Sequence, residues 1–330
     1  MFFVSFVVNT MSDIDKRLVV ALGGNAISAP GKIGDIDEQF AQVTETAESL
    51  CSAIERGYHL IVTHGNGPQV GNILRRVEIA RSELYPIPLE VCVADTQAGM
   101  GYMIAQCLSN AMNRRNLTTD VTAVVTTVLV DPHDPAFQDP NKAIGPMLSE
   151  AQAVEHRDKD GWQIRDEGKG RFRRVVPSPS PRKIIEMPAI ESLIVGGQIV
   201  VCCGGGGIPV AVDSNGRVRG VAAVIDKDRT TGLLARHLQA PTLVILTAVE
   251  YACINFGKPD EQRLEQLTAE EADAYMMAGQ FGAGSMRPKI EAGIDFVRNS
   301  PHANPVAIIA HVDHFAAALD GKSGTRITRN

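Results

Sequence analysis

The sequence lacks the cysteine spacing of a disulfide-rich or zinc-binding protein. None of the six cysteines among its 330 residues belongs to a CxxC pair, and most of them lie within apolar runs. We therefore expect reduced, buried thiols, as in a cytoplasmic protein, and no zinc site. An excess of basic residues is also missing, because the formal net charge is −6. We accordingly expect neither nucleic acid nor a membrane as a partner, and any bound anion must be held by a local cluster of residues.

Two common phosphate-binding motifs are absent from the sequence as well. It contains no GxxxxGK[ST] motif, and no GxGxxG motif opens a helix after the first predicted strand. A P-loop NTPase and a dinucleotide-binding Rossmann domain are therefore poorly supported.

The N-terminal stretch lacks the features of a targeting segment. Residues 1–8 are apolar, but no basic segment precedes them and no small-residue cleavage site follows them. The run is also too short to cross a membrane. We expect residues 1–16 to form a tail or an accessory strand.

Three predicted strands lead directly into glycine-rich loops. Residues 18–22 lead into Gly23, Gly24 and Asn25, residues 60–63 into His64, Gly65 and Asn66, and residues 199–203 into four consecutive glycines. A helical pattern at residues 35–56 separates the first two strands, and this βαβ order predicts an α/β fold with a parallel sheet. Backbone N–H groups of such loops bind phosphate oxygens, and ligands gather beyond the carboxyl ends of parallel strands.

A lysine between two carboxylates follows the third loop. We expect a strand at residues 221–225, which leads into Asp226, Lys227 and Asp228, and a helix at residues 230–239. A lysine can neutralise the charge that develops during phosphoryl transfer, and a neighbouring carboxylate can hold it in place. The glycine loop and this lysine together predict a phosphate site. We expect His64 to support its loop through hydrogen bonds and assign it no role in proton transfer.

The middle of the chain interrupts the alternation of strands and helices. We expect a helix at residues 90–112 and a buried strand at residues 121–130, after which residues 131–176 are broken by prolines and dense in charge. We interpret this segment as an excursion from the main sheet that is mobile enough to act as a lid. Lys142 lies within it, and by itself it resembles an ordinary solvated loop lysine.

The last part of the chain contains a second candidate lysine. Strands are expected at residues 242–246 and 306–309, with a helix at residues 269–277 and a glycine-bearing tail at the end. Two glycines and a serine precede Lys289, which begins a helix expected at residues 289–298. The N-terminus of this helix adds N–H donors and a partial positive charge, which favours an anion there.

Eight sequence blocks identify a family resemblance. In chain order they are LVVALGGNAI, THGNGPQVGN, DPNKAIGP, SPSPRKIIE, CGGGGIPV, VIDKD, INFGKPD and FGAGSMRPK. With these blocks the chain resembles the carbamate kinases of the amino-acid kinase family, almost continuously over residues 18–328. Eight blocks in the same order make a chance agreement untenable.

The resemblance implies a fold and an organisation into lobes. It implies an open, mainly parallel sheet of about eight strands sandwiched by helices, with a protruding subdomain at about residues 131–176. Residues 17–198 would form an N-terminal lobe that binds carbamate or carbamoyl phosphate, and residues 199–330 a C-terminal nucleotide-binding lobe. It further implies a cytoplasmic homodimer.

The resemblance also implies an activity. It predicts reversible phosphoryl transfer between carbamoyl phosphate and ADP, giving ATP and carbamate, with Mg²⁺ accompanying the nucleotide. We assign no protein side chain as a metal ligand. The activity would serve catabolic ATP production, as in the degradation of arginine or of purine-derived compounds.

Individual site residues follow from the matching blocks. Lys142, Lys227, Asp228 and Lys289 would be catalytic: Lys227 and Lys289 would bracket the transferring phosphoryl group, Asp228 would orient them, and Lys142 would close over the substrate. The implied substrate-binding residues are Gly23, Gly24, Asn25, Gly65, Asn66, Gly205 and Gly206. The implied nucleotide-binding residues are Lys227, Thr247, Val249, Met286, Pro288 and Lys289.

One departure and two alternatives remain at this stage. Related kinases often carry a TDVD pattern where this chain has Thr247, Ala248, Val249 and Glu250, so the nucleotide contacts there stay open. One alternative is a kinase for another small carboxylate or amino acid, such as N-acetylglutamate, which the segment around Lys142 argues against. The other is a non-catalytic nucleotide-binding homologue, which the retention of the three lysines and Asp228 disfavours.

Deletion of residues 1–10 tests the interpretation of the N-terminal tail. The segment precedes the first family block, so we expect kinase activity and melting temperature to stay close to those of the full chain. Steady-state kinetics and thermal unfolding of both forms provide the measurement. A large loss in either would mean that Phe2, Phe3 and Phe6 pack on the body of the protein.

Overall fold

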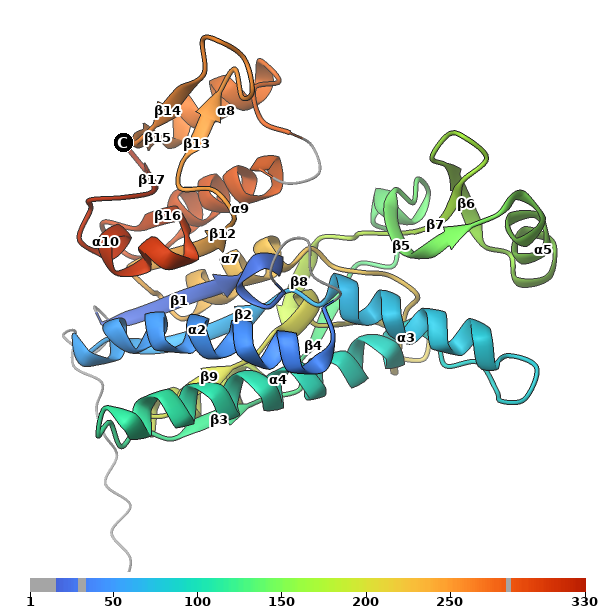
Figure 1. The fold of residues 1–330 in the computed structure, drawn as a ribbon, viewed down its shortest axis with the longest axis horizontal. Coiled ribbons are helices and arrows are strands. Elements are labelled where there is room, and N and C mark those ends of the chain that lie inside the picture. Colours follow the sequence, from blue (N-terminus) through green and yellow to red (C-terminus); the bar gives the residue numbers. More distant parts are fainter. Residues whose placement is uncertain (1–15, 29–33, 283–285) are drawn as a thin grey trace, which may run out of the picture.

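The computed structural model describes residues 16–28, 34–282 and 286–330 of the chain (Figure 1). Residues 1–15 of the predicted tail lie outside these ranges. The described residues form an α/β fold in which helices cover both faces of a central sheet, as the sequence predicted. None of the helices within these ranges is both long and apolar enough to cross a membrane. Five of the six cysteines are buried, and none of the six forms a disulfide.

The central sheet consists of eight strands within the described residues. In spatial order they are β15 (Gln266–Thr268), β17 (Thr325–Thr328), β16 (Val306–His311), β12 (Thr242–Thr247), β1 (Arg17–Leu22), β2 (His59–His64), β9 (Ile199–Val201) and β3 (Val121–Ala123). The strands from β16 through β3 pair in parallel, whereas β17 runs antiparallel to β16. The predicted mainly parallel, eight-stranded sheet is therefore confirmed. Strand β17 lies in the segment that we expected to be only a glycine-bearing tail.

The side chains of β1 point alternately into two hydrophobic cores, one on each face of the sheet. Leu18 and Val20 pack against α2 (Ile36–Glu55), α4 (Leu89–Arg114) and α10 (Phe315–Leu319) on one face. Val19 and Ala21 pack on the opposite face, where the following helices lie: α6 (Met187–Val195), α7 (Lys227–His237), α8 (Ala269–Met277) and α9 (Met286–Asn299). Because both faces are covered, the strand is a continuous apolar run, as is typical of a parallel sheet. Each fully buried aliphatic side chain contributes roughly 1.5–3 kcal/mol to stability.

A second sheet lies beside the main one, and it contains part of the strand predicted at residues 121–130. Its spatial order is β11 (Val218–Gly220), β10 (Ile208–Val212), β4 (Thr127–Val130) and β8 (Pro181–Ile184). The single strand predicted at residues 121–130 is wrong, because its first part is β3 of the main sheet and its last part is β4 of this one. The chain changes sheet at Thr126, whose backbone N–H donates to the Gln97 side chain and whose hydroxyl accepts from the backbone N–H of Cys203 at 3.0 Å.

The segment at residues 131–176 forms the protruding subdomain. Its three strands are antiparallel, in the order β5 (Lys142–Leu148), β7 (Phe172–Val176) and β6 (Gln163–Asp166), and they carry α5 (Glu150–Asp160). Figure 1 shows these elements projecting to the right of the main body, near the end of α3 (Gly67–Ala80). Helix α5 contacts α3 through polar side chains, since Asp160 forms an ion pair with Arg81 and the buried His156 lies 3.2 Å from Glu78. What the sequence presented as an irregular excursion is thus an ordered small sheet.

The strand predicted at residues 221–225 is also wrong. These residues form a loop, and α7 begins at Lys227, three residues before the predicted start. The apolar run reflects burial of the loop itself, because Ala223 and Ile225 are almost fully buried. A buried loop and a buried strand have the same apolar composition, so periodicity could not separate them. Lys227 therefore lies at a helix N-terminus and not at a strand end.

Strand β9 pairs with two strands that come earlier in the chain. It begins at Ile199, the first residue of the predicted C-terminal lobe, yet it pairs with β2 and β3, which both belong to the predicted N-terminal lobe. The continuous sheet thus crosses the boundary predicted between residues 198 and 199. A division by sequence position does not follow the hydrogen bonding of the sheet.

The glycine loop after β9 packs too tightly for any other residue. Gly205 and Gly206 have φ angles of +64° and +88°, in the region that L-residues rarely adopt. A Cβ atom at Gly205 would lie 2.2 Å from the Asn66 side chain, and one at Gly206 would lie 2.5 Å from the carbonyl oxygen of Ile225. The absence of side chains therefore lets this loop contact both the loop after β2 and the segment that leads into α7.

Replacing Gly206 with alanine tests this close approach. The variant combines an unfavourable φ angle with a backbone clash, so we expect it to destabilise the fold by roughly 2–5 kcal/mol. Gly216→Ala is the matched control, because Gly216 has a φ angle of +76° but open space around a Cβ atom. We expect about 1–2 kcal/mol for the control, from backbone strain alone. Urea unfolding of the two variants gives the comparison, and equal losses would contradict the tight packing.

Candidate active site

The glycine loops meet at one edge of the central sheet. Strands β1 and β2 pair in parallel with Leu22 opposite His64, so Gly23 and Gly65 follow at the same edge. The backbone N–H of Gly65 donates to the carbonyl of Leu22 at 3.0 Å, and Gly23 lies against the end of β12 at Leu246. Because all these strands are parallel, their carboxyl ends bring the loops together. The structure thus gathers the substrate-binding loops that the sequence predicted.

Asn66 is held firmly within this cluster of loops. Its side chain is buried, and its Nδ2 donates to the Thr96 hydroxyl at 2.9 Å. It also lies against Gly205 of the loop after β9. This hydrogen bond and the contact with Gly205 fix the side chain of Asn66 in the cluster. Gly24 and Asn25 lie in a short 3₁₀ turn directly after β1, with Gly24 exposed.

His64 occupies a buried position beneath the glycine loop. Burial lowers the pKa of its imidazole to about 4, and the nearby Lys227 acts in the same direction. The ring is therefore neutral near pH 7, with Nδ1 at 3.1 Å from the carbonyl oxygen of Gly65. A Cβ atom on Gly204 would lie 2.3 Å from Nε2 of this ring. These contacts agree with the expected supporting role of His64.

One carboxylate joins the two lysines that the sequence analysis singled out. Lys227 and Asp228 are the first two residues of α7, and Lys289 lies in the first turn of α9. Asp228 accepts a hydrogen bond from the Lys227 ammonium on one oxygen and from Lys289 Nζ, at 3.0 Å, on the other. The Asp228 side chain is only 5% exposed, so these are buried ion pairs. The arrangement is the one expected if Asp228 orients both lysines.

Burial and charge act against each other in this cluster. Burial by itself raises the pKa of the Asp228 carboxyl, but the ammonium groups of Lys227 and Lys289 outweigh it and hold this pKa well below its usual range. Burial lowers the pKa of Lys227, and repulsion from Lys289 adds to this, while Asp228 opposes it. One carboxylate against two ammonium groups leaves an excess of positive charge. An incoming phosphate oxygen would neutralise that excess.

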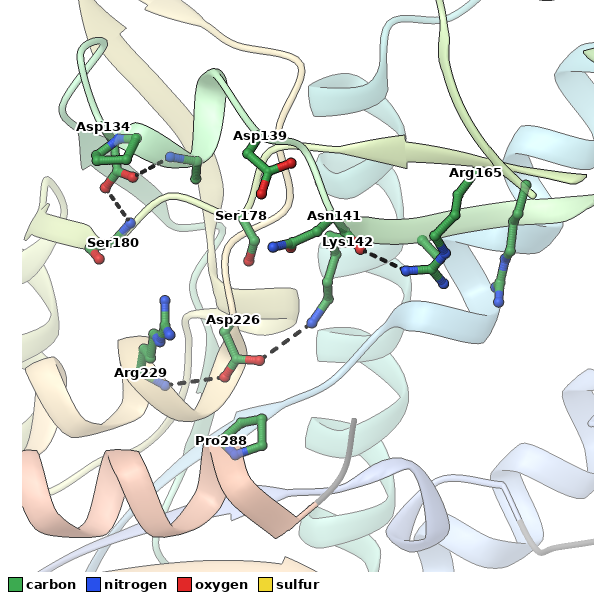
Figure 2. A pocket seen from close by; sticks show the side chains of 14 residues that line it. Asp134, Asp139, Asn141, Lys142, Arg165, Ser178, Ser180, Asp226, Arg229 and Pro288 are labelled. Atoms are coloured by element: carbon green, nitrogen blue, oxygen red, sulfur yellow. Dashed lines mark hydrogen bonds and ion pairs between the residues drawn. The ribbon is translucent and has the colours of Figure 1, made fainter. Parts of the chain in front are cut away.

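The protruding subdomain supplies the third lysine. Lys142 is the first residue of β5, and its Nζ lies 3.4 Å from Asp226 Oδ2 at the start of α7 (Figure 2). Both residues line a cavity of about 960 Å³, together with Pro288 of α9 and residues of the subdomain such as Asn141 and Arg165. This cavity is much larger than carbamoyl phosphate and lies between the subdomain and the two helix starts. Lys142 is therefore not the isolated loop lysine that its sequence surroundings suggested.

A second, apolar cavity lies next to the start of α9. It has a volume of about 260 Å³ and contains three of the predicted nucleotide-binding residues, Thr247, Val249 and Met286. Sequence analysis missed its aromatic and thiol neighbours, which are Tyr251, Cys253, Phe256 and Phe281. No motif marked them, although their position directly after β12 and before α9 was a usable signal. An apolar cavity with aromatic walls suits a planar ring such as a nucleobase.

Of the remaining predicted nucleotide contacts, Lys227 and Lys289 line neither of these two cavities. Pro288 lines the large cavity and is not part of the apolar one. Glu250, at the position where the sequence departs from the TDVD pattern, accepts a hydrogen bond from the Ser323 hydroxyl at 3.0 Å and lies 3.2 Å from His314. Its carboxylate is thus engaged with the C-terminal part of the chain. No group of three or more His, Cys, Asp or Glu side chains in residues 16–28, 34–282 and 286–330 is arranged to hold a metal ion.

Comparison with known proteins agrees with this geometry. The model of the amino acid kinase family matches residues 16–310. Carbamate kinase from Pyrococcus horikoshii is 42% identical over 95% of this chain and 99% of its own length. Carbamate kinase 1 from Enterococcus faecium is 44% identical with the same coverage of both chains.

A solved structure shows the same relationship. Carbamate kinase from Giardia lamblia bound to AMP-PNP superposes with a TM-score of 0.91, at 39% identity, over 96% of this chain and all of the other. Matches of this identity and coverage show that this chain and its relatives belong to one family. The chain therefore belongs to the amino acid kinase family and is similar to carbamate kinases along nearly its whole length.

Proposed function

We propose that this protein is a carbamate kinase, which transfers a phosphoryl group reversibly between carbamoyl phosphate and ADP to give ATP and carbamate. The observation that carries the proposal is the Asp228 carboxylate, which holds the buried ammonium groups of Lys227 and Lys289 at the edge where the glycine loops end. Both lysines come from helix N-termini, whose partial positive charge adds to their own. The site is thus built to stabilise the negative charge of a phosphoryl group.

The position of each group suggests the path of the phosphoryl group. Lys227 lies beside Gly65 of the proposed substrate-binding loops, whereas Lys289 lies on the helix that begins at Met286 of the apolar cavity. The bond between phosphorus and the carbamate oxygen would break while a bond to the terminal ADP oxygen forms. Carbamate leaves as an anion, so no proton has to move. Positioning and charge neutralisation suffice, which explains why no nucleophile or general base is needed.

We further propose that the nucleotide binds as its Mg²⁺ complex. Two anionic phosphate chains must approach each other, and the lysines alone would neutralise them only in part. The Giardia relative was solved with AMP-PNP, which supports a nucleotide as the ligand. We propose that its base occupies the apolar cavity, whose aromatic walls suit a planar ring. We extend the proposal to a cytoplasmic homodimer in catabolic ATP production, in the degradation of arginine or of purine-derived compounds.

Another acceptor within the family is the second candidate. A kinase of N-acetylglutamate or of another small carboxylate would need the same phosphate cluster. Lys142, which belongs to a block that resembles carbamate kinases and lines the large cavity, argues against this alternative. A screen of small carboxylates and amino acids with ATP distinguishes the two candidates.

A coupled assay for ATP production tests the proposed function directly. We expect ATP to form from ADP and carbamoyl phosphate in a Mg²⁺-dependent reaction, and excess EDTA to abolish it until Mg²⁺ is restored. ATP formation that persists with excess chelator would contradict the metal requirement. Binding of nucleotide without any turnover would favour the non-catalytic alternative.

Alanine substitutions separate the roles of the lysines. Lys227→Ala and Lys289→Ala should each lower kcat by about 10² to 10³, the usual scale for one preorganised donor, with a smaller change in KM. Lys142→Ala should weaken carbamoyl phosphate binding as well as slow the reaction. Arginine should replace none of the three, because its planar group needs more room than a compact ammonium.

The matched control for these variants is Lys322→Ala. Lys322 is an exposed lysine whose nearest acid, Asp320, lies 3.9 Å away. Steady-state kinetics with each substrate varied in turn should leave this control at the wild-type values. If Lys227→Ala and Lys289→Ala also kept a wild-type kcat, neither lysine would act in phosphoryl transfer.

A further inference from the structure

Helix α7 begins with two carboxylates of different function. Asp228 holds Lys227 and Lys289, as described above. Asp226 is the N-cap of the helix, and its Oδ1 accepts from the backbone N–H groups of Asp228 at 2.9 Å and Arg229 at 3.4 Å. These two bonds satisfy helix donors that would otherwise lack a partner. They also fix the orientation of the Asp226 side chain relative to the catalytic residues that follow it.

The second oxygen of Asp226 contacts the subdomain. Lys142 Nζ donates to Asp226 Oδ2 at 3.4 Å, and Figure 2 shows the two side chains extending toward each other across the cavity. The Lys142 side chain is 41% exposed and that of Asp226 is 16% exposed. A pair this exposed contributes little to the stability of the fold. Its effect is therefore on the position of the ammonium group.

Two neighbouring arginines pair with other carboxylates, whereas Lys142 pairs with Asp226. Arg165 on β6 pairs with Glu167 at 2.6 Å, and the Arg229 guanidinium lies 3.4 Å from Glu291. Arg229 contacts Asp226 through its backbone N–H, which the dashed line in Figure 2 marks, and not through its guanidinium. The two carboxylates at the start of α7 thus bind all three proposed catalytic lysines, which come from three different elements.

We propose that Asp226 is a positioning residue that places the ammonium group of Lys142 for phosphoryl transfer, as Asp228 does for the other two lysines. This inference rests on the proposed function. An ammonium group has three N–H donors, so the bond to Asp226 leaves two for phosphate oxygens in the cavity. The negative charge of Asp226 also reduces the repulsion between Lys142 and the positive cluster at Lys227 and Lys289. Without this contact, Lys142 would follow the subdomain, which is a separate small sheet.

A double-mutant cycle between Asp226 and Lys142 tests the proposal. Asp226→Asn retains an oxygen that caps the helix but removes the charge that attracts Lys142. We expect this variant to lower kcat/KM for carbamoyl phosphate about tenfold in the wild-type background, since contacting residues couple at this scale. In the Lys142→Ala background the same change should cost less than about twofold, because the partner is already gone. An equal loss in both backgrounds would show that Asp226 acts independently of Lys142 and would overturn the proposal.

Two further variants control the cycle. Asp226→Ser also caps the helix but cannot reach Lys142, so it should reproduce the kinetics of Asp226→Asn, and it replaces that variant if the asparagine form does not fold. Asp131→Asn breaks the pair with Arg182, which has the same distance of 3.4 Å but exposed partners outside the site. We expect wild-type kinetics for Asp131→Asn.

Hydrogen exchange separates this proposal from the proposed function. In the substrate-free protein, amides of β5 should exchange faster in Asp226→Asn than in the wild type, since the contact that ties Lys142 to α7 is lost. This measurement requires no turnover. If the wild type makes no ATP, the proposed function fails. Hydrogen exchange in β5 then remains the test of the contact between Lys142 and Asp226. Unchanged exchange in β5 would then overturn the positioning of Lys142.

Discussion

The rest of the site depends on one buried carboxylate that binds two ammonium groups. Asp228 lies at the start of α7, almost without solvent, and joins Lys227 to Lys289 of α9. Removing one partner of a buried ion pair costs about 3–5 kcal/mol, because the charge that remains is left uncompensated. The three groups therefore constrain one another, and a bound anion would neutralise their excess positive charge. Stability and phosphate binding are coupled through this cluster.

The architecture brings these charges to the glycine loops. Helices α7 and α9 pack together on one face of the sheet, so that their N-termini lie near the carboxyl ends of the parallel strands. The loops after β1, β2 and β9 end at the same edge, and glycine lets the loop after β9 lie directly against the Asn66 side chain of the loop after β2. Backbone donors, helix N-termini and lysines thus converge on one region. A single strand with its loop would not have created this site.

Two charged contacts join the subdomain to the main body, in addition to the apolar cluster of Ile144 on β5 with Val70 and Leu74 on α3. Far from the site, the ion pair of Asp160 with Arg81 joins α5 to α3, and the buried His156 lies 3.2 Å from Glu78. At the site, Lys142 meets the N-cap of α7. The first contact fixes the subdomain to the body, and the second sets the place of one side chain. The large cavity lies between the subdomain and the starts of α7 and α9.

The α/β class, the parallel core strands and the glycine loops could be predicted from the sequence, because apolar periodicity and short motifs are local properties, and the three candidate lysines followed from the family blocks. Tertiary structure alone decided that residues 221–225 form a buried loop, that residues 121–130 divide between two sheets, and that aromatic residues line the apolar cavity. It also decided that Asp228 meets Lys289, 61 residues away, and that Asp226 meets Lys142, 84 residues away. Periodicity reports that a segment is buried but does not say what buries it. Contacts between distant segments arise only when the helices and sheets pack.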